Sequence, residues 1–390
     1  MKPHLVIPRA FHLVGRDHRS GTRVYRFIVD RFLLLPLGAL LALVWANTAA
    51  ESYFRFSNAM AFPVNEIAMT LFLALLAQDV LEGVMPGGAL HRWRHWSLPL
   101  VAAAGGIVGS VGVYFAYVTL GHETVLRGAW PIACVIDIAA GYYVLKTIAR
   151  RSSMLPFLVL LAAATDAFGL LVAAVWPRFV ERSPASPLLV IAALGLALLF
   201  KRCGVRAFWP YLTICGPLSW AGLYWAGIHP ALALVPLVPF LPHEPRRKEV
   251  FAEPAADDAV HRTEREWHEM VQLVLFFFGL VNAGEVLRGY DTGTWAVLTA
   301  GLVGRPAGIL LATALAVAVG LRLPRDIGWR EVIVVALATT SGFTFALFFA
   351  TGLLPLGAVL TQIKVGALLT TSGALVTLGL ARCLRVGRFG

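Results

Sequence analysis

The stretch LLAAATDAFGLLVAAVW, residues 160–176, is apolar except for Thr165 and the carboxylate of Asp166. An apolar run of roughly 20 residues is long enough to cross a bilayer as a helix. An ionised side chain near the centre of such a helix costs at least about 2.5 kcal/mol, and it usually marks a functional site. The stretch therefore predicts a membrane-spanning helix in which Asp166 has a function.

The rest of the 390-residue chain has the same character, because 58% of its residues are hydrophobic and only 14% are charged. Apolar runs lie at 31–47, 65–83, 98–119, 129–147, 155–177, 187–200, 207–225, 229–242, 270–287, 294–320, 331–351 and 358–381. Backbone polar groups inside a bilayer must be satisfied within the segment, so we predict an all-α polytopic membrane protein with about 12 transmembrane helices.

Basic residues are concentrated on one side of the predicted membrane. Of the 33 Lys and Arg residues, 26 lie in the two termini and in alternate loops, five lie in the other loops, and two lie inside helices. Because basic loops stay in the cytoplasm, both termini are predicted to be cytoplasmic. This topology accounts for the net charge of +11, so no nucleic-acid partner is expected.

The polar segments and the cysteines point to no further chemistry. A basic tail at 1–30, a mixed-charge connector at 243–269 and a short tail at 383–390 all fall on the predicted cytoplasmic side. The four cysteines have no paired spacing, so neither a disulfide framework nor a metal cluster is expected. We expect no cofactor and no enzymatic activity.

Two of the apolar runs contain polar interruptions: WPIACVIDIAAG at 130–141 and ALATTSGFTFALFF at 336–349. Interrupted spans at matching places in two halves of a chain indicate an inverted repeat with a binding site between the halves. The residues assigned to the interrupted segments are Pro131, Thr339, Thr340, Ser341 and Gly342. A packing face of small residues is the alternative interpretation of the second segment.

Four charged residues lie well inside apolar spans: Asp137, Asp166, Arg305 and Lys364. Two acids and two bases can neutralise one another, so we expect Asp166 to be held by an Arg and a Lys from other helices. A purely structural set of ion pairs is the alternative. Asp137 has a second possible use, because an acid at a helix break compensates the positive N-terminal ends of half-helices.

Other ionisable residues lie near the ends of spans and are candidates for a pH response. Asp79 and Glu82 share one helix face near the predicted cytoplasmic end, where solvation of a surface is the plainer interpretation. His229 is predicted to begin a helix on the outer side, and its titration range suits a switch. Glu264 lies in the connector.

With these residues assembled, the chain resembles the NhaA-type sodium/proton antiporters over roughly residues 31–385. The resemblance is carried by WPIACVIDIAAG, AAATDAFG, GIHPALA, FGLVNAG, GLVGRPAGI, TTSGFTF and IKVGALL, in this order. It implies inverted repeats with crossing, broken fourth and eleventh helices. It also implies a transport core at 98–184 and 289–382, and an interface domain at 31–97 and 185–288.

The family further implies Na⁺ or Li⁺ and H⁺ as transported ions, membrane lipid as surroundings, and a role in pH homeostasis in a bacterial inner membrane. Many members form a homodimer through the outer loop between the first two helices. By this resemblance Asp166, with Thr165 beside it, is the cation and proton exchange site. Asp137 matches the acid of the broken fourth helix, and Arg305 and Lys364 match the basic positions that compensate charge. Asp79, His229, Glu264 and approximately Glu82 match pH-responsive positions.

The chain departs from the family pattern at the exchange site itself. The family usually has two adjacent aspartates, and here Thr165 stands in place of the first. Arg305 stands in place of the usual lysine of the tenth helix. Ile136 replaces the residue with a hydroxyl beside the acid of the fourth helix. Neither a threonine nor a guanidinium titrates in the physiological range. We therefore predict exchange of one proton per cation.

Three other functions are compared with this one. A sodium-coupled symporter of an organic solute on the same fold, and a degenerate sensor without transport, both remain open. An intramembrane aspartyl protease is disfavoured, because VID and TDAFG lack the tyrosine and the glycine pair of the YD and GxGD motifs.

Overall fold

The computed structural model describes residues 34–84, 93–134, 138–148, 153–175, 183–205, 207–241, 259–287, 290–324, 326–340, 342–354 and 357–389. Within these ranges every regular element is a helix, which confirms the all-α prediction. The α-helices are α2 (Leu34–Thr48), α3 (Ala50–Phe62), α4 (Met69–Val84), α5 (Trp93–Leu120), α6 (Pro131–Cys134), α7 (Ile138–Ile148), α8 (Met154–Val175), α9 (Ser186–Arg202), α10 (Gly216–Ala226), α11 (Ala259–Asn282), α12 (Thr292–Thr299), α13 (Arg305–Ala318), α14 (Trp329–Ala338), α15 (Thr344–Leu353), α16 (Ala358–Leu369) and α17 (Gly373–Cys383).

Several neighbouring helices are continuous, because short π- or 3₁₀-helical turns join them. The longest continuous apolar helices are Ala50–Gln78, Ser97–Leu120, Met154–Val175, Thr292–Ala318 and Ala358–Cys383. By length and composition, each of these five can cross a membrane. The chain is therefore a multi-pass membrane protein.

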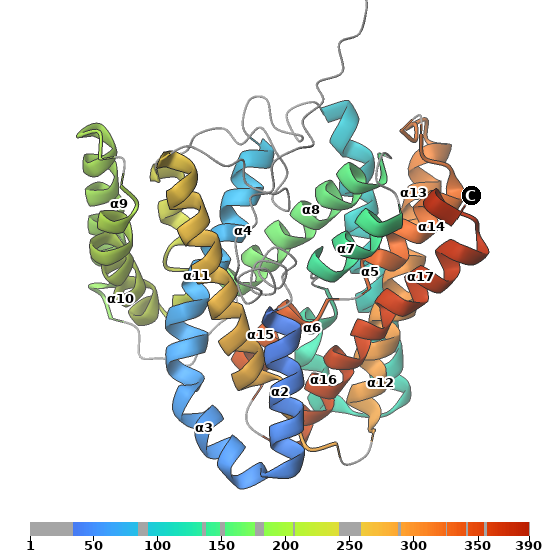
Figure 1. Cartoon of the computed structure of the whole chain (residues 1–390), viewed down its shortest axis with the longest axis horizontal. Coiled ribbons are helices and arrows are strands. Elements are labelled where there is room, and N and C mark those ends of the chain that lie inside the picture. Colours follow the sequence, from blue (N-terminus) through green and yellow to red (C-terminus); the bar gives the residue numbers. More distant parts are fainter. Residues whose placement is uncertain are drawn as a thin grey trace, which may run out of the picture.

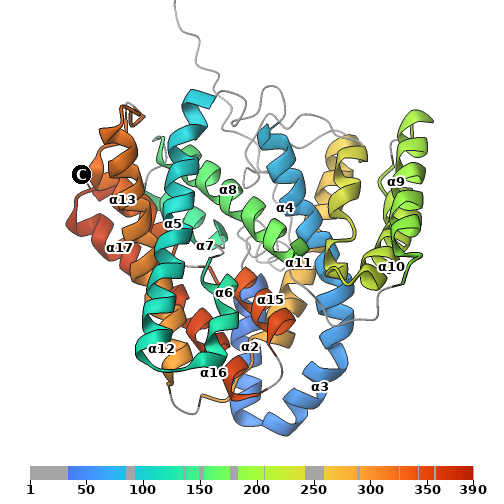
Figure 2. The same cartoon turned by 180° about the vertical axis from the view of Figure 1, so that it is seen from behind.

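The second interrupted segment, 336–349, is a broken helix, as predicted, whereas the centre of the first, residues 135–137, lies outside the described residues. α6 ends at Cys134 and α7 begins at Ile138, while α14 ends at Ala338 and α15 begins at Thr344. α6 packs against α15, and α7 packs against α14, so the half-helices of the two segments cross near the middle of the molecule (Figures 1 and 2). Each crossing pair therefore brings helix ends, with their unpaired backbone groups, into the interior.

The long helices beside the breaks pack very closely. α5 lies along α13, where Gly105 and Gly109 face Gly304 and Gly308. A side chain at Gly109 would collide with the backbone of the facing helix, since its Cβ would lie 2.8 Å from the Cα of Gly308. Small residues allow helix backbones to approach in this way inside membranes. This contact fixes α13, and with it Arg305, against α5.

The eighth apolar run, 229–242, differs from its prediction as an α-helix. Its described part forms two short 3₁₀ segments, Pro230–Leu232 and Val235–Phe240. Pro236 and Pro239 lack the backbone N–H that an α-helix needs, which explains the irregular path. Apolar composition alone does not distinguish these two conformations.

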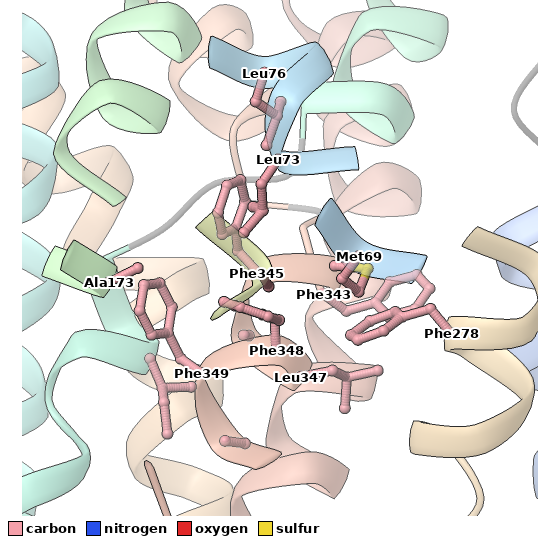
Figure 3. Packing of buried hydrophobic residues seen from close by; sticks show 14 of the residues in the cluster. Met69, Leu73, Leu76, Ala173, Phe278, Phe343, Phe345, Leu347, Phe348 and Phe349 are labelled. Atoms are coloured by element: carbon pink, nitrogen blue, oxygen red, sulfur yellow. The ribbon is translucent and has the colours of Figure 1, made fainter. Parts of the chain in front are cut away.

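The helices form two groups with an apolar seam between them. We define a first helix group, α2, α3, α4, α9, α10 and α11, and a second helix group, α5–α8 and α12–α17; α4 packs against α8 across the boundary between them. Figure 3 shows the seam at α15, which contributes Phe345, Leu347, Phe348 and Phe349. These side chains pack beside Met69, Leu73 and Leu76 of α4, Ala173 of α8 and Phe278 of α11.

Candidate functional site

Asp166 and Thr165 lie in the middle of α8, a helix that packs against α6, α7 and α14. Both are buried, with 6% and 1% of their surface exposed. The Thr165 hydroxyl donates a hydrogen bond to the Leu161 carbonyl one turn earlier, at 2.9 Å. Because that bond uses the hydroxyl proton, the lone pairs of the Thr165 oxygen stay available as acceptors beside the carboxylate.

Arg305 binds the backbone of both α6 and the end of α14. It begins α13 directly after the π-helical turn Ala300–Gly304, and only 3% of its surface is exposed. Its guanidinium donates to the carbonyl of Ala133 at 2.9 Å and to the carbonyl of Thr339 at 3.1 Å. Ala133 lies in α6, and Thr339 caps the C-terminal end of α14, where helix carbonyls lack partners and carry partial negative charge. The Arg305 guanidinium thus has peptide carbonyls among its partners, and its role in charge compensation stays a prediction.

Threonine hydroxyls donate hydrogen bonds to backbone carbonyls around the break between α14 and α15. Thr339 donates to the carbonyl of Ala336, and Thr340 donates to the carbonyl of Leu337, each at 2.7 Å. Thr370, between α16 and α17, donates to the carbonyl of Gly342 at 3.2 Å. Ser341 and Asp137 lie outside the described residues, and Pro131 begins α6 and is buried.

Lys364 has a different partner from the one expected. Its ammonium lies 3.0 Å from Oε1 of Glu285, so Glu285 and not Asp166 neutralises it. Both residues are buried, with 8% and 5% exposure. Glu285 was missed by the sequence interpretation, because it lies near the end of the apolar run 270–287 and not in the middle of a run as Asp166 does.

His229 is buried, and it precedes the 3₁₀ segment at Pro230 instead of an α-helix. Its Nδ1 accepts from the backbone N–H of Ala231 at 3.3 Å, and it lies 3.8 Å from Oε2 of Glu66, a partly buried acid that the sequence interpretation missed. The Nδ1 of His229 therefore faces both the Ala231 N–H and the Glu66 carboxylate. The ring also contacts Phe348 of α15.

The remaining pH-response candidates stay predictions. The structure places Asp79 and Glu82 in α4 and Glu264 in α11, but the positions of their side chains lie outside what it describes.

Comparison with known proteins agrees with this arrangement. The family model described as "Na+/H+ antiporter 1" matches residues 30–381. The chain belongs to this family. It is 38% identical over 371 residues to Na(+)/H(+) antiporter NhaA 1 of Pelobacter propionicus, covering 91% of this chain and 96% of the relative. It is 35% identical over 381 residues to Na(+)/H(+) antiporter NhaA of Desulfitobacterium hafniense, covering 93% and 97%.

A solved structure shares the fold of this antiporter family member. The sodium proton antiporter MjNhaP1 from Methanocaldococcus jannaschii at pH 8 superimposes with a TM-score of 0.53. The two are 16% identical in sequence, and the superposition covers 93% of each chain. At this identity the likeness concerns the fold alone.

Proposed function

We propose that this antiporter family member exchanges Na⁺ or Li⁺ for H⁺ across a bacterial inner membrane by alternating access. The observation that carries the proposal is the buried carboxylate of Asp166, placed with Thr165 in a membrane-spanning helix against both broken helices. The relatives' names, Na(+)/H(+) antiporter, support the same ions. A role in pH homeostasis follows from such an exchange.

Competition at one carboxylate couples the two ion fluxes. A carboxylate holds either a proton or a hard cation, and a cation such as Na⁺ prefers oxygen ligands. Asp166, the lone pairs of Thr165 and water would supply these ligands, and Asp137 remains a further candidate. Pro131 and the segment Thr339–Gly342 would line the site from the helix breaks.

The number of protons exchanged per cation follows from which side chains of the proposed site can bind and release a proton. Thr165 has no acidic proton, and Arg305 keeps its charge, so Asp166 carries one proton for each cation. Exchange of one proton for one monovalent cation moves no net charge. The exchange is therefore electroneutral.

The orientation and the moving parts belong to the same proposal. The distribution of basic residues places both termini in the cytoplasm. The interface domain, 31–97 and 185–288, would stay fixed while the transport core, 98–184 and 289–382, moves. A homodimer would use the segment between the first two predicted spans, 31–47 and 65–83, which contains helix α3.

The test uses purified full-length protein in proteoliposomes. Addition of Na⁺ is expected to release protons, and Asp166→Asn is expected to abolish this release, while Asp326→Asn at an exposed position leaves it intact. Retained exchange in Asp166→Asn contradicts the site. Na⁺-driven uptake of an organic solute, or no ion movement in the wild type, would favour the symporter or the sensor.

A second measurement tests the stoichiometry in the same vesicles. The wild-type exchange rate is expected to be the same with and without an imposed membrane potential, because no net charge crosses. A rate that follows the potential contradicts exchange of one proton per cation.

A further inference from the structure

A buried ion pair joins the two helix groups at the end of the molecule where α11 ends and α16 begins. The Lys364 ammonium of α16 lies 3.0 Å from Oε1 of Glu285. Thr361, one turn earlier on α16, donates to the other carboxylate oxygen, Oε2, also at 3.0 Å. Helix α16 of the second group therefore holds both oxygens of this carboxylate.

The backbone around Glu285 is held by the first helix group. Asn47 of α2 donates its side-chain N–H to the Glu285 carbonyl at 2.9 Å and accepts from the Leu287 N–H at 3.2 Å. The Gly284 N–H donates to the Tyr53 hydroxyl of α3 at 3.0 Å. The first helix group thus binds the main chain around Glu285, and the second helix group binds its side chain.

The Glu285–Lys364 ion pair differs from the apolar seam at α15 in how it responds to movement of the groups. At the seam the two groups meet through phenylalanine and leucine side chains, which can repack against one another without leaving a buried charge unpaired (Figure 3). A buried ion pair has no such intermediate arrangement, because separating it leaves two charges without compensation. The pair consequently distinguishes sharply between two relative positions of the groups.

We propose that Glu285 and Lys364 form a latch that holds the two helix groups in the arrangement described here. The latch rests on the proposed alternating access: when the second group moves against the first, the Glu285–Lys364 pair opens. Lys364 is then a positioning residue for one state of the transporter, and it takes no part in holding the exchanged ions.

The test measures the distance between the groups. Spin labels are placed on cysteines introduced at Asn58 of α3 and at Val125, which lies between α5 and α6; both positions are exposed. The exposed native cysteines, Cys203 and Cys383, are replaced by serine. In lipid nanodiscs, Glu285→Gln is expected to shift the ratio of two distance populations by about tenfold or more relative to the unsubstituted label background.

Matched variants separate a latch from a general loss of structure. Glu51→Gln removes an acid from the exposed pair with Arg55, and it is expected to leave the distances unchanged. The exchanged pair Glu285→Lys with Lys364→Glu is expected to return the distribution toward that of the wild type. Thr361→Val keeps both charges, so it replaces Glu285→Gln as the test variant if Glu285→Gln fails to fold. Thr361→Val is expected to shift the ratio of the two distance populations in the same direction, by a smaller amount.

The outcomes separate the latch from the proposed function. Identical distance distributions in the wild type and Glu285→Gln overturn the latch, even if Na⁺-induced proton release is intact. Absence of proton release in the wild type overturns the proposed function, and the distances still decide whether the pair holds the two groups. With both correct, Glu285→Gln retains exchange that Asp166→Asn abolishes, at a turnover rate changed severalfold.

Discussion

Arg305 and Lys364 are both buried cations of the second helix group, but the structure satisfies them in different ways. Arg305 donates to two peptide carbonyls at the ends of broken helices, whereas Lys364 pairs with the single carboxylate of Glu285. Peptide carbonyls cannot take up a proton or move away from their helices. The Glu285 carboxylate lies between helix groups that can separate.

The comparison shows two uses of positive charge inside one membrane protein. A guanidinium presents several donors in a fixed planar fork, which suits two carbonyls that converge from different helices. An ammonium is a compact charge, which suits a single carboxylate. Arg305 therefore stabilises the packing of α6 against α14 and α13, and in the proposed latch Lys364 stabilises one relative position of the helix groups.

The largest effect on stability is expected from Lys364→Met. The substitution leaves the Glu285 carboxylate buried without its cation, and removing one partner of a buried pair costs about 3–5 kcal/mol. Thermal unfolding of the purified protein in detergent measures the loss, with the exposed Lys201→Met as the control. A loss below about 1 kcal/mol, typical of a surface pair, would show that this pair contributes little.

A smaller loss is expected from Arg305→Lys. A lysine lacks the fork that reaches the carbonyls of both Ala133 and Thr339, so one charge-assisted hydrogen bond is lost, at a cost of about 1.5–3 kcal/mol. Arg127→Lys makes the same change at an exposed position. Equal unfolding temperatures for Arg305→Lys and the wild type would contradict the bridging role of the guanidinium.

The smallest loss is expected from Thr361→Val. Valine has nearly the same shape. The hydrogen bond to Oε2 of Glu285 at 3.0 Å disappears, together with a longer contact at 3.5 Å to the Gly357 carbonyl of the preceding turn, at a cost of about 1 kcal/mol. Thr371→Val is the matched control, because the Thr371 hydroxyl binds only the Leu368 carbonyl of the preceding turn. If the two variants unfold alike, the carboxylate depends on Lys364 alone.

The sequence was sufficient for the all-helical, multi-pass architecture and for the interruption at 336–349, because both depend on local composition, whereas the number of about 12 spans stays a prediction. An apolar run predicts a span wherever it occurs, and polar residues within it predict an interruption. The same reasoning failed for the run 229–242, since hydropathy ignores the missing N–H groups of its prolines. Counting Pro236 and Pro239 would have corrected the prediction.

The partners of the buried charges could not be predicted in the same way. Pairing depends on which helices become neighbours, and no local pattern in the sequence determines that. Lys364 was therefore assigned to the acids already identified, while Glu285 lies near the end of its apolar run, where a charge is usually interfacial. The main-chain carbonyls that bind Arg305 carry no sequence signal at all.

The hydrogen bonds of Arg305 also affect the order in which the protein can be completed in a membrane. Ala133 precedes Arg305 by 172 residues, so the carbonyl at the end of α6 is synthesised long before its donor. Until Arg305 is synthesised, the Ala133 carbonyl lacks the guanidinium that binds it in the complete protein. The N-terminal half of the chain can therefore form this contact only after much of the C-terminal half has been made.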